Sequence, residues 1–206
     1  MTELGLRERK KQQTRRKILD TALRLFAARG FDQVPVSEVA READVSVATV
    51  FNYFPTKEDL VYDGMDDFEV ALVDAVRQRP AGERMLDTFR RFVLRPHSLV
   101  DHPEAVGRIA TIARVITDSP ALQARERQVF DRYTRELAEL VAAETSAKPH
   151  DIGPWVVANA LMGVNRALKD FVHGQALAGR TGAQIAKDVL TQGRRALALL
   201  EAGLDC

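Results

Sequence analysis

The sequence has one cysteine among its 206 residues, and it is the last residue, Cys206. A lone cysteine forms no intramolecular disulfide and builds no cysteine-based zinc site, so we expect a reducing compartment, the cytoplasm. Long apolar runs are also missing. None approaches the roughly 18–20 residues that span a bilayer, and the N-terminal residues contain no hydrophobic signal core. The sequence therefore predicts no membrane association.

Catalytic patterns are also missing. The spacings HExxH, GxSxG and GxxxxGK[ST] do not occur, so we expect no enzyme and no cofactor. A metal site formed by His97, Asp101 and His102 is an alternative. A solvated loop between helices is the favoured interpretation, because metal ligands normally have closer spacing and more members. The sequence thus predicts no metal site.

Cations are concentrated near the N-terminus, although the net charge is only +1. Residues 7–17 contain seven Arg and Lys against one Glu, a local charge of +6. Such a segment is typical of a nucleic-acid-binding end, and we assign residues 1–13 to a basic arm. A solvated, frayed terminus is the alternative that charge alone leaves open.

Apolar residues recur at helical spacing in nearly every segment. In residues 14–29, for example, Ile18, Ala22 and Phe26 share one face, and Gly30 follows where a C-terminal cap belongs. No segment alternates with the period of a strand. We predict an all-α fold of about nine helices. They cover residues 14–29, 36–43, 46–54, 56–79, 85–95, 102–120, 120–144 and 154–172, and the last begins near residue 182.

Residues 45–60, VSVATVFNYFPTKEDL, are rich in the β-branched and aromatic types that favour strands. A helix separates the apolar from the polar side chains better than a strand does. It places Val47, Val50, Phe51 and Phe54 on one inward stripe, and Ser46 stands at the N-cap position. Beyond it, a Thr and an Asp three residues apart form a weaker version of a capping box. We therefore predict a helix over residues 46–54.

The sequence DVS joins this helix to residues 36–43, which gives the spacing of a helix-turn-helix. The second helix of that motif can enter the major groove of DNA, which is about 12 Å wide. Its outer face is small and hydrogen-bonding, with Ala48, Thr49, Asn52 and Tyr53. The pattern therefore indicates a DNA-reading helix.

Residues 18–60 resemble the DNA-binding domain of the tetracycline-repressor (TetR) family of bacterial transcriptional regulators. The resemblance lies in the Ala–Phe–Gly spacing of the first helix, in VAREADVS, and in an aromatic–x–Tyr–Phe–x–x–Lys–Glu–x–Leu run. It implies a homodimer that binds a palindromic double-stranded DNA operator. It also implies a DNA-binding domain over residues 14–72 and a domain over residues 73–206 that binds a small molecule and dimerises through its last two helices.

The resemblance also implies individual DNA contacts. The residues expected to face base edges are Ala48, Thr49 and Asn52. Those expected to contact phosphates are Ser37, Ser46, Tyr53 and Lys57, and the charge pattern adds Arg15 and Arg16. Three positions depart from the family pattern, and they concern single phosphate contacts rather than the binding mode. Asp44 replaces a usual Gly, which Asp tolerates because it visits the left-handed region. Phe51 replaces a frequent Tyr, and Pro35 replaces a hydroxyl residue.

A ligand site is expected on the penultimate helix, where polar groups recur among apolar ones at spacings of four, seven and eleven residues. The predicted ligand residues are Trp155, Asn159, Met162 and Arg166, together with Phe89, Phe92, Arg108 and Arg114. Two alternatives stay open: Arg166 pairs across a dimer interface, and Asn159 is a satisfied core amide. The effector is expected to be hydrophobic or mixed in character, and a regulator without a ligand is a further alternative.

Repression of transcription is favoured over activation, because the chain shows no separate activation segment. We expect ligand binding to tilt the helix that begins at Thr56 and so release the operator. An ordinary helical hairpin, or an interaction protein with a vestigial helix-turn-helix, is the competing interpretation of residues 36–60. The cations before Ile18 argue against the interaction protein, since protein partners alone give no reason for them.

Overall fold

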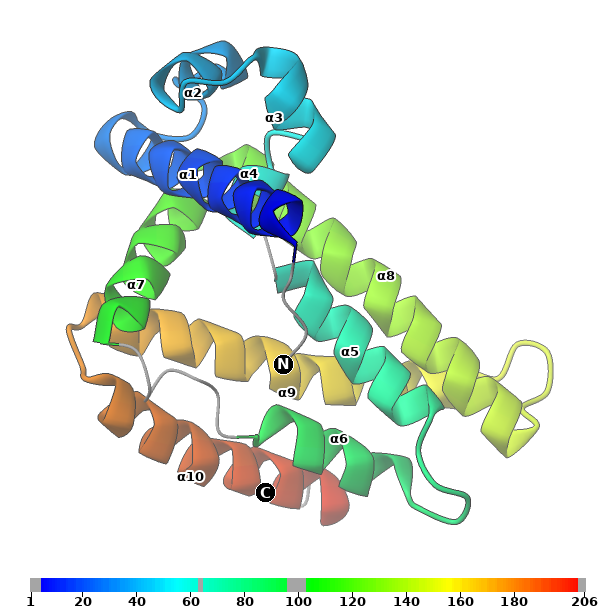
Figure 1. Ribbon diagram of the computed structural model, residues 1–206. Helices are drawn as coiled ribbons and strands as arrows, with labels where there is room; N and C mark the ends of the chain where they lie inside the picture. The colour runs from blue at the N-terminus through cyan, green and yellow to red at the C-terminus, as the bar shows by residue number, and fades with distance from the viewer. Residues whose placement is uncertain (1–4, 63–64, 96–102, 204–206) are drawn as a thin grey trace. The chain divides into compact units, whose positions relative to one another are not determined.

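The computed structural model describes residues 5–62, 65–95 and 103–203, and over these residues the chain forms ten α-helices and no strand (Figure 1). This confirms the all-α prediction, with one helix more than the nine expected. The helices are α1 (Leu6–Arg29), α2 (Val36–Glu42), α3 (Val47–Tyr53), α4 (Asp59–Tyr62), α5 (Met65–Arg77), α6 (Met85–Val93), α7 (Pro103–Thr117), α8 (Pro120–Thr145), α9 (Gly153–Leu177) and α10 (Gly182–Glu201).

The chain divides into two compact units. The N-terminal unit consists of residues up to 64 and residues 111–125, which include α1 to α4, the second half of α7 and the start of α8. The C-terminal unit consists of residues 65–110 and 126–206, with α5, α6, α9, α10 and the rest of α7 and α8. The chain therefore passes between the units three times, and two of these crossings lie inside helices.

The N-terminal unit is built on the apolar stripe of α1. Ile18 and Ala22 are fully buried, and the ring of Phe26 meets that of Phe31 edge-on at 5.0 Å between centroids. The helix begins at Leu6, eight residues before the expected start at Thr14. Arg, Lys, Gln and Glu are good helix formers, so the basic segment continues the helix although it has no apolar stripe. Most of the predicted arm is thus helical.

The C-terminal unit packs around α9 and α10. Its core includes the fully buried side chains of Leu72, Phe89, Leu137, Ile185 and Leu197. A capping box begins α10: Thr181 Oγ1 accepts from the backbone N–H of Gln184 at 3.4 Å, and Gln184 Oε1 accepts from that of Thr181 at 3.1 Å.

In the region of the expected helix over residues 56–79, the structure describes α4 from Asp59 to Tyr62 and α5 from Met65 to Arg77, and residues 63–64 lie outside the described residues. The capping pair is confirmed, because the backbone N–H of Thr56 donates to the Asp59 carboxylate at 2.8 Å and that of Asp59 to Thr56 Oγ1 at 3.3 Å. Tyr62 is buried, and its hydroxyl donates to the Leu122 carbonyl at 2.8 Å. This tertiary bond ties the end of α4 to α8 within the N-terminal unit.

Among the described helices, none is both long enough and apolar enough to cross a bilayer.

Candidate nucleic-acid interface

The turn between α2 and α3 has the geometry that a helix-turn-helix requires. Asp44 has a φ of +54°, the left-handed conformation expected at this position. The backbone N–H of Val45 donates to the Ala40 carbonyl at 3.0 Å, and that of Asp44 donates to the Arg41 carbonyl at 3.1 Å. These bonds satisfy carbonyls at the end of α2 and fix where α3 begins.

Ser46 caps α3 as predicted. Its Oγ accepts from the backbone N–H of Thr49 at 3.0 Å and lies 2.8 Å from Thr49 Oγ1. The two hydroxyls that were expected to contact DNA are therefore bonded to each other at the start of the helix, where Ser46 is exposed and Thr49 is half-buried.

The buried face of α3 is narrower than predicted. Val50 and Phe54 are each 1% exposed and belong to the core, as expected. The prediction is wrong for Val47 and Phe51, which are 40% and 44% exposed. A seven-residue helix makes only two turns, and burial at positions i and i+4 is enough to anchor it. Its open surface is therefore part apolar and part polar, and the sequence pattern missed these two exposed side chains.

The predicted base-reading residues lie on this open surface. Ala48 and Asn52 are exposed, and Thr49 is half-buried. Of the phosphate set, Ser37 is exposed in the first turn of α2 and Arg16 is exposed on α1. The structure thus presents these polar groups on the surface of one unit.

Two predicted phosphate contacts also pack against the unit itself. Lys57 Nζ donates to the Phe31 carbonyl at 2.6 Å and lies 4.2 Å from the Phe31 ring centroid. Burial lowers the pKa of Lys57, whereas the charges of Asp32 and Glu58 oppose that shift. The Arg15 guanidinium lies 4.9 Å from the ring centroid of Phe54. These cation–ring contacts are tertiary, so the charge pattern of the sequence did not predict them.

The predicted ligand residues lie partly in a buried core and partly on the surface, and their role in ligand binding stays a prediction. Phe89, Met162 and the partly buried Phe92 belong to the core of the C-terminal unit, and the Phe92 ring meets that of Phe68 at 5.1 Å. Asn159 and Trp155 are exposed on α9, and Asn159 Nδ2 donates to the carbonyl of Trp155 at 2.7 Å.

The predicted arginines lie on surfaces. Arg166 is exposed, with its guanidinium 5.6 Å from the ring centroid of Phe130, and Arg108 and Arg114 are exposed on α7. Helical spacing placed Arg166 on one side of α9 together with Trp155, Asn159 and Met162, but it did not define what covers that side. Trp155 lines a hollow of about 440 Å³ with the second half of α8, residues 147–149 and Asp151.

The considered metal site at His97, Asp101 and His102 lies outside the described residues. Within the described part of the chain, no group of three or more His, Cys, Asp or Glu side chains is arranged to hold a metal ion.

Comparison with known families gives two matches along the chain. Residues 18–62 match the family described as bacterial regulatory proteins of the tetR family. Residues 83–205, more than half of the chain, match the family described as the MftR C-terminal domain. The first match contains α2, the turn and α3.

Two relatives are similar over much of the chain. MftR of Mycobacterium tuberculosis, named for mycofactocin biosynthesis, is 28% identical over 165 residues, which cover 80% of this chain and 81% of that protein. The transcriptional regulator TcmR of Streptomyces glaucescens is 30% identical over 145 residues, 68% of this chain and 63% of TcmR.

Solved structures share the fold. NalD, the secondary repressor of a multidrug efflux pump in Pseudomonas aeruginosa, superposes with a TM-score of 0.57 at 18% identity, over 90% of this chain and 96% of NalD. The fatty acid degradation regulator FadR of Bacillus halodurans gives a TM-score of 0.53 at 19% identity, over 89% and 94%. The helix-turn-helix geometry and both family matches agree: the chain belongs to the TetR family of DNA-binding transcriptional regulators, with a C-terminal domain of the MftR type.

Proposed function

We propose that the protein is a repressor that binds a palindromic operator as a homodimer and leaves it when a small molecule binds the C-terminal unit. The observation that carries the DNA-reading part is the division of α3 into two faces. Val50 and Phe54 anchor the helix in the core, whereas Ala48 and Asn52 are exposed. A short helix anchored on one side and open on the other suits the major groove.

The open face of α3 offers two kinds of base contact. Asn52 can donate to and accept from the edge of an adenine, the bidentate contact that Asn favours. Ala48 and the methyl of Thr49 can contact thymine methyl groups, and the exposed Val47 and Phe51 extend this apolar contact. We therefore expect half-sites that contain A·T pairs opposite α3.

Phosphate contacts are assigned to the hydroxyl and cationic residues around α3. They hold the helix in register and carry little sequence information. The assigned residues are Arg15, Arg16, Ser37, Ser46, Tyr53 and Lys57. Lys57 has a second role, because its bond to Phe31 links the segment after α3 to the loop after α1.

Dimerisation is assigned to α9 and α10. These helices carry several of the large apolar side chains that are exposed in the single chain: Trp155, Val156, Val157, Leu177 and Leu199. A second copy of the chain would cover such a surface. Two α3 helices of a dimer then reach successive major-groove faces about 34–36 Å apart, and a chromosomal operator places the protein in the cytoplasm.

Release of the operator is assigned to the chain crossings between the units. Effector binding in the C-terminal unit would change the conformation of the N-terminal unit through α7 and α8. Both helices continue across the unit boundaries. The third crossing lies between α4 and α5, within the region where a single helix was expected.

The proposal is tested by titrating the protein against DNA from immediately upstream of its own gene, with a scrambled duplex as control. Binding that prefers the upstream DNA and weakens by orders of magnitude as salt rises supports it. Absence of binding to either duplex at low salt would overturn the DNA-binding assignment.

A further inference from the structure

The stripe of α1 that packs into the N-terminal unit changes its chemistry along the helix. Ile18 and Ala22 are fully buried and apolar. Nearer the N-terminus of α1, the residues on the same side of the helix are Arg7, Lys11 and Thr14, which are spaced four and three residues apart. The side of α1 that contacts the core at one end is therefore cationic at the other end.

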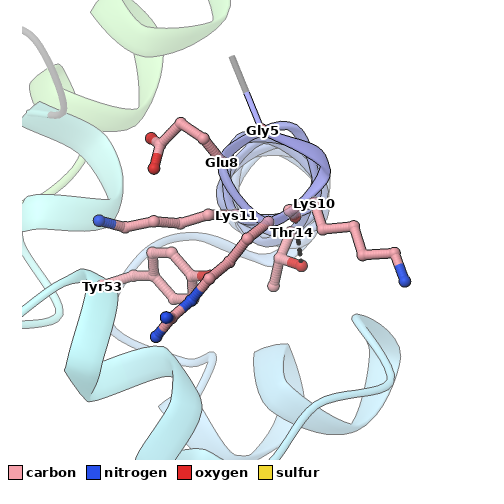
Figure 2. A pocket seen from close by; sticks show the side chains of 7 residues that line it. Gly5, Glu8, Lys10, Lys11, Thr14 and Tyr53 are labelled. Carbon is pink, nitrogen blue, oxygen red and sulfur yellow. Dashed lines mark hydrogen bonds between the residues drawn. The ribbon is translucent and has the colours of Figure 1, made fainter. Parts of the chain in front are cut away.

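This cationic end of the stripe is exposed and lines an open hollow beside α3. The hollow has a volume of about 740 Å³ and is lined by α1 and by Tyr53, the last residue of α3. Figure 2 shows Lys11 and Tyr53 extending into the same space, whereas Lys10 points away from Tyr53. The complete lining is Gly5, Arg7, Glu8, Lys10, Lys11, Thr14 and Tyr53.

The lining favours an anion with several charges. Its single carboxylate, Glu8, is held by Gln12, whose Nε2 donates to Glu8 Oε1 at 3.2 Å. Thr14 contributes a neutral hydroxyl, whose Oγ1 donates to the Lys10 carbonyl at 3.0 Å. Three cationic side chains and one phenol match the hydrogen-bond donors that proteins use for DNA phosphates. The lining has no aliphatic side chains, which a hydrophobic ligand would require.

We propose that Arg7, Lys11 and Tyr53 form a second DNA contact, which holds the phosphodiester backbone beside the bases read by α3. This rests on the proposed function, because it is α3 in the major groove that brings a DNA strand to Tyr53. The first two turns of α1 then widen the footprint of each protomer. The contact adds affinity that depends on salt and does not depend on base sequence.

The test is the salt dependence of binding to a labelled duplex of mixed sequence, about 30 bp long, by fluorescence anisotropy between about 50 and about 200 mM NaCl. The full-length protein is compared with the double variant Arg7→Ala/Lys11→Ala. The matched control, Arg127→Ala/Lys148→Ala, removes two exposed cations of the C-terminal unit. All four side chains are exposed, so each variant should fold, which circular dichroism checks.

Loss of two phosphate contacts should reduce the slope of log K against log salt by about 2 per protomer, with no change in the control. A slope equal to that of the unsubstituted protein would overturn the second contact, and would leave an acidic protein segment as the partner to consider. Absence of duplex binding by the unsubstituted protein is a different result, because it would contradict the proposed function itself.

Discussion

The N-terminal and C-terminal units place their polar side chains differently. On α3 the exposed Asn52 lies on a helix anchored by Val50 and Phe54, each 1% exposed. In the C-terminal unit the predicted ligand residues are divided between the core, where Met162 is 2% exposed, and the surface, where Trp155 is 46% exposed. A groove-reading helix needs one open face, which local spacing defines. A pocket needs side chains from several helices to converge, which local spacing does not define.

The largest effect is expected where the anchor of α3 is removed. Phe54→Ala should lower the free energy of unfolding by about 3–5 kcal/mol, because a fully buried ring is replaced by a cavity. Phe51→Ala, three residues away and 44% exposed, should cost less than about 1 kcal/mol. Urea unfolding followed by circular dichroism measures both. Equal losses for the two variants would contradict the assignment of the faces.

A smaller loss is expected in the C-terminal unit at an ion pair of low exposure. Lys169 Nζ contacts Glu126 Oε1 and lies 4.9 Å from the ring centroid of Phe130, and the two charged side chains are 15% and 16% exposed. Lys169→Met should lower the free energy of unfolding by about 2–3 kcal/mol, because the carboxylate of Glu126 loses its partner.

The double variant Glu126→Gln/Lys169→Met is the control for that substitution. It removes both charges and should recover most of the loss. If the double variant is less stable than Lys169→Met alone, the ion pair is not the source of the effect.

The smallest effect is a pH dependence that the C-terminal unit should show. His173 is mostly buried, and burial followed by the charge of Lys169 lowers its pKa, against the opposing charges of Glu126 and Asp170. The unfolded chain therefore binds a proton that the folded chain does not, below the ordinary His pKa of about 6.5. Stability should rise with pH up to that value and stay level above it.

Urea unfolding between about pH 5 and about pH 8 measures this dependence. Carboxylates with a lowered pKa, such as Asp87 bonded to Arg84, lose their contribution to the free energy of unfolding at lower pH. They therefore do not change stability within this pH range. His173→Gln should flatten the profile below about pH 6.5. An unchanged slope in that variant would assign the effect to another group.

The sequence was sufficient for features that depend on neighbours in the chain. The α2–α3 turn and the Ser46 cap follow from local patterns and were predicted, and the left-handed Asp44 was expected because the family usually has Gly at that position. The Thr56–Asp59 pair is of the same kind.

Features that depend on distant residues were not predictable in this way. Lys57 bonds to a carbonyl 26 residues earlier, and Tyr62 bonds to one 60 residues later. The exposure of Val47 and Phe51 depends on how much of α3 the rest of the unit covers. The burial of the predicted ligand residues was not predictable for the same reason, since periodicity shows which residues share a face but not what packs against it.

The most direct test of the account is whether Asn52 reads a base. The operator is first isolated by selecting bound duplexes from a random pool, and affinity for it is then compared with affinity for a mixed-sequence duplex. Asn52→Ala should reduce this discrimination by about 1–3 kcal/mol, or about 5- to 150-fold. Gln78→Ala, which removes an exposed carboxamide from the C-terminal unit, should not change it. Unchanged discrimination in Asn52→Ala, with binding intact, would contradict the assignment of α3's open face as the surface that reads DNA.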